Sequence, residues 1–216
     1  MDRGTGPSAT VCRSMRTLLV LMLTRGGFAP RALTGQVAVD VSVGARYSGV
    51  LVHDSIVTPF DVRPALAPTV AVTVATPLER GWAAQGTLDF STSELVRHDA
   101  DGSSVALGRV STAAFTIGLQ RRLPAGFSAR IGVGGLKYIP GEHSGIFRLG
   151  SGPIAGLGAL TLCRALPVGR RFSFAVEARY DMHPFMTQAL RDKGFDSPRL
   201  VHRVALAILG RGRGTR

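Results

Sequence analysis

The chain has 216 residues, which is enough for one domain with a sizeable core, and it carries a formal net charge of +12. Two cysteines, Cys12 and Cys163, are too few for a disulfide framework or a cysteine-based metal cluster. The chain contains no apolar run of the roughly 18 residues that a membrane-spanning helix needs, so a helical membrane protein is excluded.

The positive charge does not predict a nucleic-acid partner. Arginine supplies almost all of it, with lysine only at positions 137 and 193, and the arginines are spread along the chain. Nucleic-acid binding usually gathers cations on one helix or beside aromatic residues on a strand, and the sequence has neither pattern. We therefore expect dispersed surface, interior and tail charge, and no nucleic-acid partner.

The N-terminus has the pattern of an export signal. "MRTLLVLML", from Met15 onward, places a basic residue before a short apolar stretch, and the small-residue segment "ALTGQ" follows, with a cleavage point near Gly35. We expect residues 1–35 to be an N-terminal targeting segment whose signal peptide starts at Met15. The folded domain then covers residues 36–211, and a basic tail covers residues 212–216.

From Val37 onward, apolar and polar residues alternate in successive segments, which predicts β-strands with one apolar and one polar face. In chain order the segments are "VAVDVSVGARYS", "TVAVTVATPL", "WAAQGTLDFSTS", "STAAFTIGLQ", "GFSARIGVGGLKY", "PIAGLGALTLC", "RRFSFAVEARYDM" and "RLVHRVALAILG". For the glycine-rich sixth segment, the sequence does not indicate which face is apolar. In the fifth segment, the pair Gly134–Gly135 predicts a bulge at which the alternation changes phase.

The connections between these segments are alternately long and short. The three short ones, "TPLERG", "RRLPAG" and "RALPVGR", each contain proline and glycine, which are typical of tight turns. The others are longer and polar, as in "ELVRHDADGSS", "PGEHSGIFRLGS" and "HPFMTQALRDKGFDSP". A strand meander with short turns at one end and long loops at the other is the pattern of a transmembrane β-barrel.

Alternation alone leaves open which face points inward. In a soluble, lipocalin-like barrel the apolar face would form the core, whereas in a membrane barrel it would contact lipid. The polar face consists mainly of Ala, Gly, Ser and Thr with single charges, while a solvent-exposed strand face normally carries long charged side chains more densely. Small residues suit the narrow interior of an eight-stranded barrel, so we expect the polar face inside.

The outward face then carries the large apolar side chains. In the seventh segment these are Phe172, Phe174, Val176 and Tyr180. Aromatic residues near strand ends are predicted to form girdles at the two membrane interfaces. They are Tyr47, Trp82, Phe90, Phe127, Tyr138 and Tyr180.

The charged residues of the polar face are the candidate site of this chain. They are Asp40, Arg46, Asp89, Arg130, Glu177, Arg179, Asp181 and Arg203. Because a buried charge must be matched, we expect these residues to pair with one another and to plug a narrow interior. The alternative is that they line a conducting path or a ligand route.

Together, the alternating segments, the sorted turns and the "AVEARYDMHPF" stretch resemble the small OmpA/OmpW-type outer-membrane β-barrel superfamily, from Val37 to Gly210. The resemblance implies an all-β, eight-stranded, antiparallel, up-and-down transmembrane barrel with short periplasmic turns, longer outer loops and both termini periplasmic. It also implies export to the bacterial outer membrane, contact with outer-membrane lipid and insertion by the barrel-assembly machinery. One departure from the family pattern is that the last segment runs on into "LGRGRGTR" instead of ending on an aromatic residue.

The sequence gives little sign of catalysis. Its five histidines never lie three or four residues apart, so no local metal site is predicted, and neither is a cofactor. "GEHSG" places Glu142, His143 and Ser144 together, as a nucleophile and its base would be, but adjacent residues of an extended loop point apart. We expect a non-enzymatic cell-envelope protein with a structural, surface-interacting, narrow-pore or small-solute role. The alternatives are a lipid-modifying hydrolase using His143 and Ser144, and a soluble lipocalin-like carrier of an apolar ligand.

Overall fold

The computed structural model describes residues 37–54, 59–142, 145–150, 152–166 and 172–212. The predicted targeting segment, residues 1–35, lies outside the described residues. Of the predicted basic tail, residues 212–216, only Gly212 is described, and it is the last residue of a strand. These two boundaries therefore stay predictions.

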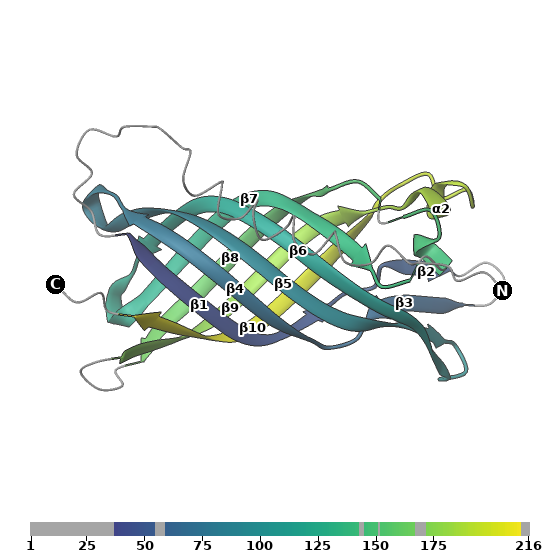
Figure 1. Ribbon diagram of the computed structural model, residues 1–216, viewed down its shortest axis with the longest axis horizontal. Coiled ribbons are helices and arrows are strands. Elements are labelled where there is room, and N and C mark those ends of the chain that lie inside the picture. The colour runs from purple at the N-terminus through teal and green to yellow at the C-terminus, as the bar shows by residue number, and fades with distance from the viewer. Residues whose placement is uncertain (1–36, 55–58, 143–144, 151, 167–171, 213–216) are drawn as a thin grey trace, which may run out of the picture. The chain divides into compact units, whose positions relative to one another are not determined.

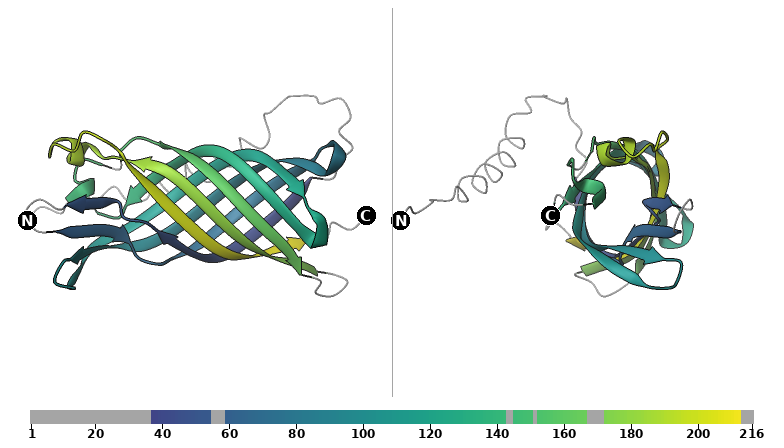
Figure 2. Two further views of the ribbon diagram at one scale, coloured as in Figure 1. Left: turned by 180° about the vertical axis from the view of Figure 1, so that it is seen from behind. Right: turned by 90° about the vertical axis from the view of Figure 1, so that its right-hand side faces the viewer.

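The strands form a closed antiparallel barrel, which confirms the eight-stranded, up-and-down, all-β fold expected from the sequence (Figure 1). Its strands are β1 (Ala38–Ser48), β4 (Ala67–Pro77), β5 (Trp82–Asp99), β6 (Ser104–Arg122), β7 (Phe127–Pro140), β8 (Ala155–Leu166), β9 (Phe172–Phe185) and β10 (Arg199–Gly212). Each pairs with its neighbours in the chain, and β1 pairs with β10 to complete the ring. Seen along its axis, the wall is a closed ring (Figure 2).

Two kinds of connection separate the ends of the barrel, which we call the turn end and the loop end. At the turn end, η1 (Glu79–Gly81) and η2 (Pro124–Gly126) join β4 to β5 and β6 to β7. Both turns place two successive residues at positive φ, Arg80 and Gly81 in the first, Ala125 and Gly126 in the second. Such turns match the right-handed twist of the paired strands and keep the hairpins tight. The third short connection, residues 167–171, lies outside the described residues.

The loop end carries additional structure. Strands β2 (Val52–Asp54) and β3 (Phe60–Pro64) lie in the first long connection, and β3 pairs with the distal part of β5. The short helices η3 (Gly145–Phe147) and α2 (Gln188–Arg191) lie in the other long connections. Among the residues that the structure describes, no helix is long and apolar enough to cross a membrane.

The prediction that "ELVRHDADGSS" forms a loop is wrong for most of the length of this segment. Strands β5 and β6 continue through it, and their 18 and 19 residues exceed the roughly 9–11 that a membrane strand requires. The extension is stable because β3 pairs with β5 and β5 with β6, so each strand gains a partner beyond the barrel. A register shift between Glu94 and Val96 marks the place where it begins.

The apolar face of the barrel strands points outward. Val43 on β1 is 57% exposed and Ile208 on β10 is 63% exposed, whereas Ser42 and Thr73 on the other face are buried. The glycine-rich β8 follows the same rule, with Leu160 outside and the other face inside. The soluble lipocalin-like alternative, which needs the apolar face inward, is therefore wrong.

The predicted bulge at Gly134–Gly135 is also wrong. The pairing of β7 with β6 and with β8 keeps one register through both glycines. Gly134 faces the interior, and a Cβ atom there would clash with the carbonyl oxygen of Phe115. This glycine therefore lets neighbouring strands approach closely where the wall curves.

Because the phase does not change, Tyr138 faces inward and not toward the membrane interface. It is only 4% exposed, so its assignment to an aromatic girdle is wrong. Tyr47 and Trp82 do point outward and are exposed near the ends of β1 and β5. Phe90 and Tyr180 are also exposed on the outward face, but in the middle of β5 and β9.

Replacing Val43 with arginine (Val43→Arg) is expected to lower the free energy of unfolding in phospholipid vesicles by about 2–4 kcal/mol, because Val43 lies halfway along β1 on the outward face. The matched control is Val39→Arg, near the start of the same strand, with an expected loss of about 0–1 kcal/mol. Urea titration followed by the fluorescence of the single tryptophan measures both losses. Equal losses at the two positions would contradict a lipid-facing band.

Candidate functional site in the barrel interior

A cluster of five charged side chains fills the middle of the barrel. Strand β1 supplies Arg46, β5 supplies Asp89, β9 supplies Arg179 and Asp181, and β10 supplies Arg203. None of them is more than 5% exposed. They meet because each occupies an inward position of its strand, and because the closed sheet brings β1, β9 and β10 side by side.

The best-defined contact of this central cluster joins β1 to β5 across the interior. The guanidinium of Arg46 binds both carboxylate oxygens of Asp89, with Nη1 against Oδ1 and Nη2 at 2.7 Å from Oδ2. The hydroxyl of Thr69 donates a further hydrogen bond of 3.2 Å to Asp89 Oδ2. Two-pronged binding of this kind fixes the relative orientation of both side chains.

The second carboxylate of the cluster, Asp181, is held by the neighbouring arginines. Its Oδ1 accepts a 2.7 Å hydrogen bond from Arg179 Nε, and its Oδ2 lies 3.4 Å from Arg203 Nη2. Longer contacts of 3.6–3.7 Å join Arg179 and Arg203 to Asp89, and Arg46 to Asp181. Each of the two carboxylates is therefore within 3.7 Å of all three arginines.

A separate ion pair lies nearer the turn end. Arg130 Nη1 on β7 is 2.8 Å from Glu177 Oε2 on β9, and both side chains are buried. The thiol of Cys163 lies 3.5 Å from the same Glu177 oxygen. Asp40, the remaining candidate, is buried on the inward face of β1. The eight candidate residues thus comprise four carboxylates and four guanidiniums, and their formal charges cancel.

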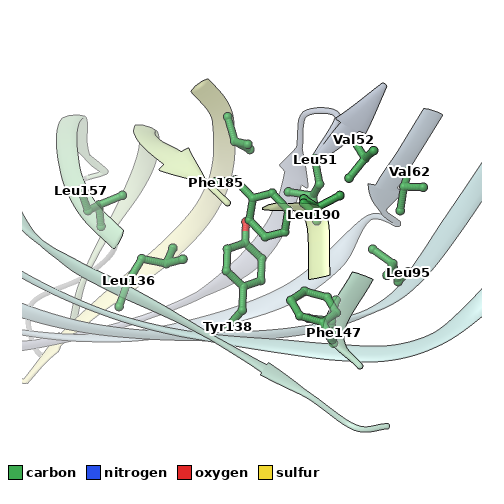
Figure 3. Close-up of a cluster of buried hydrophobic side chains, with 13 residues drawn as sticks. Leu51, Val52, Val62, Leu95, Leu136, Tyr138, Phe147, Leu157, Phe185 and Leu190 are labelled. Carbon is green, nitrogen blue, oxygen red and sulfur yellow. The ribbon is translucent and has the colours of Figure 1, made fainter. Parts of the chain in front are cut away.

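A buried apolar cluster closes the interior at the loop end (Figure 3). Its members are Leu51, Val52, Val62, Leu95, Val110, Ala114, Leu136, Tyr138, Phe147, Leu157, Phe185, Leu190 and Val201. The aromatic rings pack at its centre, with the Tyr138 and Phe185 centroids 5.0 Å apart and those of Tyr138 and Phe147 6.0 Å apart. We call this group the apolar plug.

Contacts of the loop segments hold the apolar plug in place. The Thr187 hydroxyl donates a 2.7 Å hydrogen bond to the Ile146 carbonyl, so the start of α2 is tied to η3. This contact places Leu190 and Phe147 in the same buried cluster at the loop end of the barrel. On the inner side of the plug, Tyr138 Oη lies 2.9 Å from His183 Nε2, which gives the one polar edge of this aromatic group a partner.

The sequence analysis missed this plug, although a signal for it was present. On each strand, every second residue points inward. Beyond the small and charged residues, the next inward positions of β6, β8 and β10 are the apolar residues Val110, Leu157 and Val201. The inward face is therefore polar along most of the barrel and apolar at the loop end. Following each inward series to the end of its strand would have predicted the change.

Hollows lie at both ends of the barrel, and the one at the loop end, about 520 Å³, borders the plug residues Leu95, Val110 and Phe147. The turn end has a smaller one. A hollow of about 250 Å³ lies there, lined by Gln120, Arg130, Cys163 and Leu209 among others. A much smaller cavity of about 10 Å³ lies between Gln85, Arg130 and Arg179. The hollow at the turn end therefore reaches inward as far as Arg130, and the charged cluster lies beyond it.

The described residues offer little for metal or acyl-transfer chemistry. Within the described ranges, no three side chains among His, Cys, Asp and Glu are grouped so that they would hold a metal ion. The alternative hydrolase residues His143 and Ser144 lie outside the described residues, and the adjacent Glu142 is exposed at the loop end. What the interior arrangement can do is fix the strands to one another through buried ion pairs.

Comparison with known proteins places the fold. No family model and no curated protein matches the sequence. Among solved structures, Neisserial surface protein A (NspA) is 7% identical, with 82% of this chain and 97% of that chain covered and a TM-score of 0.50. The outer membrane protein OprG from Pseudomonas aeruginosa is 11% identical, with 84% and 97% covered and a TM-score of 0.51. The resemblance drawn from the sequence is thus confirmed: this chain has the fold of the small eight-stranded outer-membrane β-barrels.

Replacing Asp181 with asparagine (Asp181→Asn) leaves three buried arginines facing one carboxylate, and the expected cost is about 3–5 kcal/mol of unfolding free energy. Asp196→Asn, at an exposed position between α2 and β10, is the control and is expected to cost almost nothing. Adding Arg203→Met to Asp181→Asn restores the charge balance and is expected to recover part of the loss. Equal stability of Asp181→Asn and the control in urea titrations would show that the cluster does not stabilise the barrel.

Proposed function

We propose that this protein is an integral protein of the bacterial outer membrane with a structural and surface-interacting role, and that its barrel does not conduct. The observation that carries the proposal is an interior blocked twice, by the charged cluster and by the apolar plug. The outward aliphatic face and the closed ladder of strands suit a bilayer, where backbone groups have no water to bind.

The orientation follows from the connections. In barrels of this fold the short turns face the periplasm and the long connections face outward. The turn end, where β1 begins and β10 ends, is then periplasmic, and the apolar plug is on the outer side. Insertion in this orientation involves the barrel-assembly machinery and contact with outer-membrane lipid.

The surface role rests on the extension at the loop end. There β2, β3, β5 and β6 form a small antiparallel sheet beyond the barrel, with the tip of the β5–β6 hairpin at residues 100–103. Strand pairing fixes this sheet to the barrel wall, so it presents its side chains as a defined surface. A rigid projection of this kind suits contact with a partner better than a polar loop without structure would.

A narrow pore and an enzyme are both less well supported. The interior carboxylates and arginines are engaged with one another, which leaves them unsuited to steer ions or to exchange protons with a substrate. The plug side chains are apolar and buried, and water does not enter a packed apolar constriction.

Cell fractionation is expected to place the protein in the outer membrane and to show that detergent is required for its extraction. The reason is the outward aliphatic band, which water cannot solvate. In detergent, unheated and boiled samples are expected to run at different positions on a gel, because the closed barrel resists unfolding. Extraction without detergent as a monodisperse monomer would overturn the membrane assignment.

In planar lipid bilayers the purified protein is expected to give no conductance steps, because the plug fills the loop end. Opening both barriers, with Phe147→Ala and Phe185→Ala in the plug and Arg46→Ala and Asp89→Ala in the charged cluster, is expected to produce conductance steps. Phe90→Ala removes a ring of the same size from the outward face and is the control, expected to stay silent. Regular steps from the unmodified protein would contradict a closed interior.

A further inference from the structure

A shallow trough runs along the outward face of the barrel wall over β4, β5, β6 and β7. Its volume is about 730 Å³, and its lining includes Val74, Ala84, Gly86, Ile117, Leu119 and Val133. The trough exists because β5 presents only Gly86 and Ala84 between larger neighbours: Val74 and Ile117 flank Gly86 in register, and Leu119 is the partner of Ala84. The floor is therefore one small-residue strip, and the walls are aliphatic.

The trough ends at a cationic and aromatic rim at the turn end. Trp82 and Arg121 are the next outward cross-strand pair after Ala84 and Leu119, and the Arg121 guanidinium carbon lies 5.2 Å from the Trp82 ring centroid. The adjacent turn exposes Arg80 beside Glu79. Positive charge therefore exceeds negative charge at this end of the trough.

We propose that this trough binds one anionic phospholipid of the inner leaflet, with an acyl chain along β5 and the phosphate at Arg121 and Arg80. The inference rests on the proposed membrane location and orientation, which put the turn end at the periplasmic surface. Tryptophan and arginine are the side chains that sit at the headgroup level, where the ring stays in the interface and the guanidinium reaches phosphate. An aliphatic trough that leads to such a rim has the shape and the charge of one lipid molecule.

A substitution at Gly86 can fill the trough with a larger side chain. A Cβ atom on Gly86 would meet only Phe115 Cε2, at 3.9 Å, which is ordinary van der Waals contact, so we expect the backbone to tolerate Gly86→Leu. Gly156 on β8 is also outward and exposed, and a Cβ there would meet nothing within 4 Å. Gly156→Leu is thus the matched control, because it adds the same side chain to the outward face away from the trough.

The test is native mass spectrometry of the detergent-solubilised protein with equal amounts of phosphatidylglycerol and phosphatidylcholine. The unmodified protein and Gly156→Leu are expected to retain one phosphatidylglycerol in preference to phosphatidylcholine. Gly86→Leu is expected to lose this adduct. Arg121→Gln is expected to weaken phosphatidylglycerol binding about fivefold, the effect of one interfacial arginine, and to leave phosphatidylcholine unaffected.

Two outcomes would overturn the proposal. The first is equal retention of the two lipids, or a phosphatidylglycerol adduct that survives Gly86→Leu. The second is a dimer that Gly86→Leu dissociates, which would assign the trough to a second copy of the chain.

A gel shift on heating confirms that each variant folds, and Ala84→Leu fills the same trough if Gly86→Leu does not fold. A detergent-requiring barrel without lipid preference would refute this inference alone, whereas extraction without detergent would refute the membrane location itself.

Discussion

The pairing of β1 with β10 is the interaction on which the other features of this molecule depend. It joins the two strands that would otherwise be the open edges of the barrel, and in a bilayer an open edge leaves backbone groups without partners. Closure also divides every strand into an inside and an outside. The outward aliphatic face, the buried ion pairs and the apolar plug all exist only because that division is complete.

The interior shows how a narrow barrel accommodates charge. Glycine, alanine, serine and threonine occupy most inward positions, and the wall is close enough at Gly134 to exclude a Cβ atom. The long arginine side chains then reach across the remaining space, as Arg46 does from β1 to Asp89 on β5. Since every carboxylate of the central cluster faces three arginines, the network stabilises a fixed arrangement of strands and not a mobile path.

Strand alternation reduced the facing of the barrel strands to two assignments, because the side-chain period is two. The small residues of the polar face and the sorted connections were then enough to choose between them and to predict the fold. Alternation also brought the eight charged residues to the same side. It did not predict which charges meet, since the contact between Arg46 and Asp89 depends on register and curvature across the whole ring. Tyr138 was assigned to the wrong face because a glycine pair was interpreted as a bulge. The extension of β5 and β6 was missed because its stability comes from β3, a strand too short to detect.

The composition of the apolar plug bears on the kinetics of this protein. Its side chains come from β2, β3, η3, α2 and the loop ends of several barrel strands, so contacts between distant parts of the chain build it. We expect such contacts to form late in folding, because loop closure must bring distant segments together first. Interactions absent from the transition state do little for the rate of folding and slow unfolding instead. The plug therefore sets how long the finished barrel survives, more than how fast it is made.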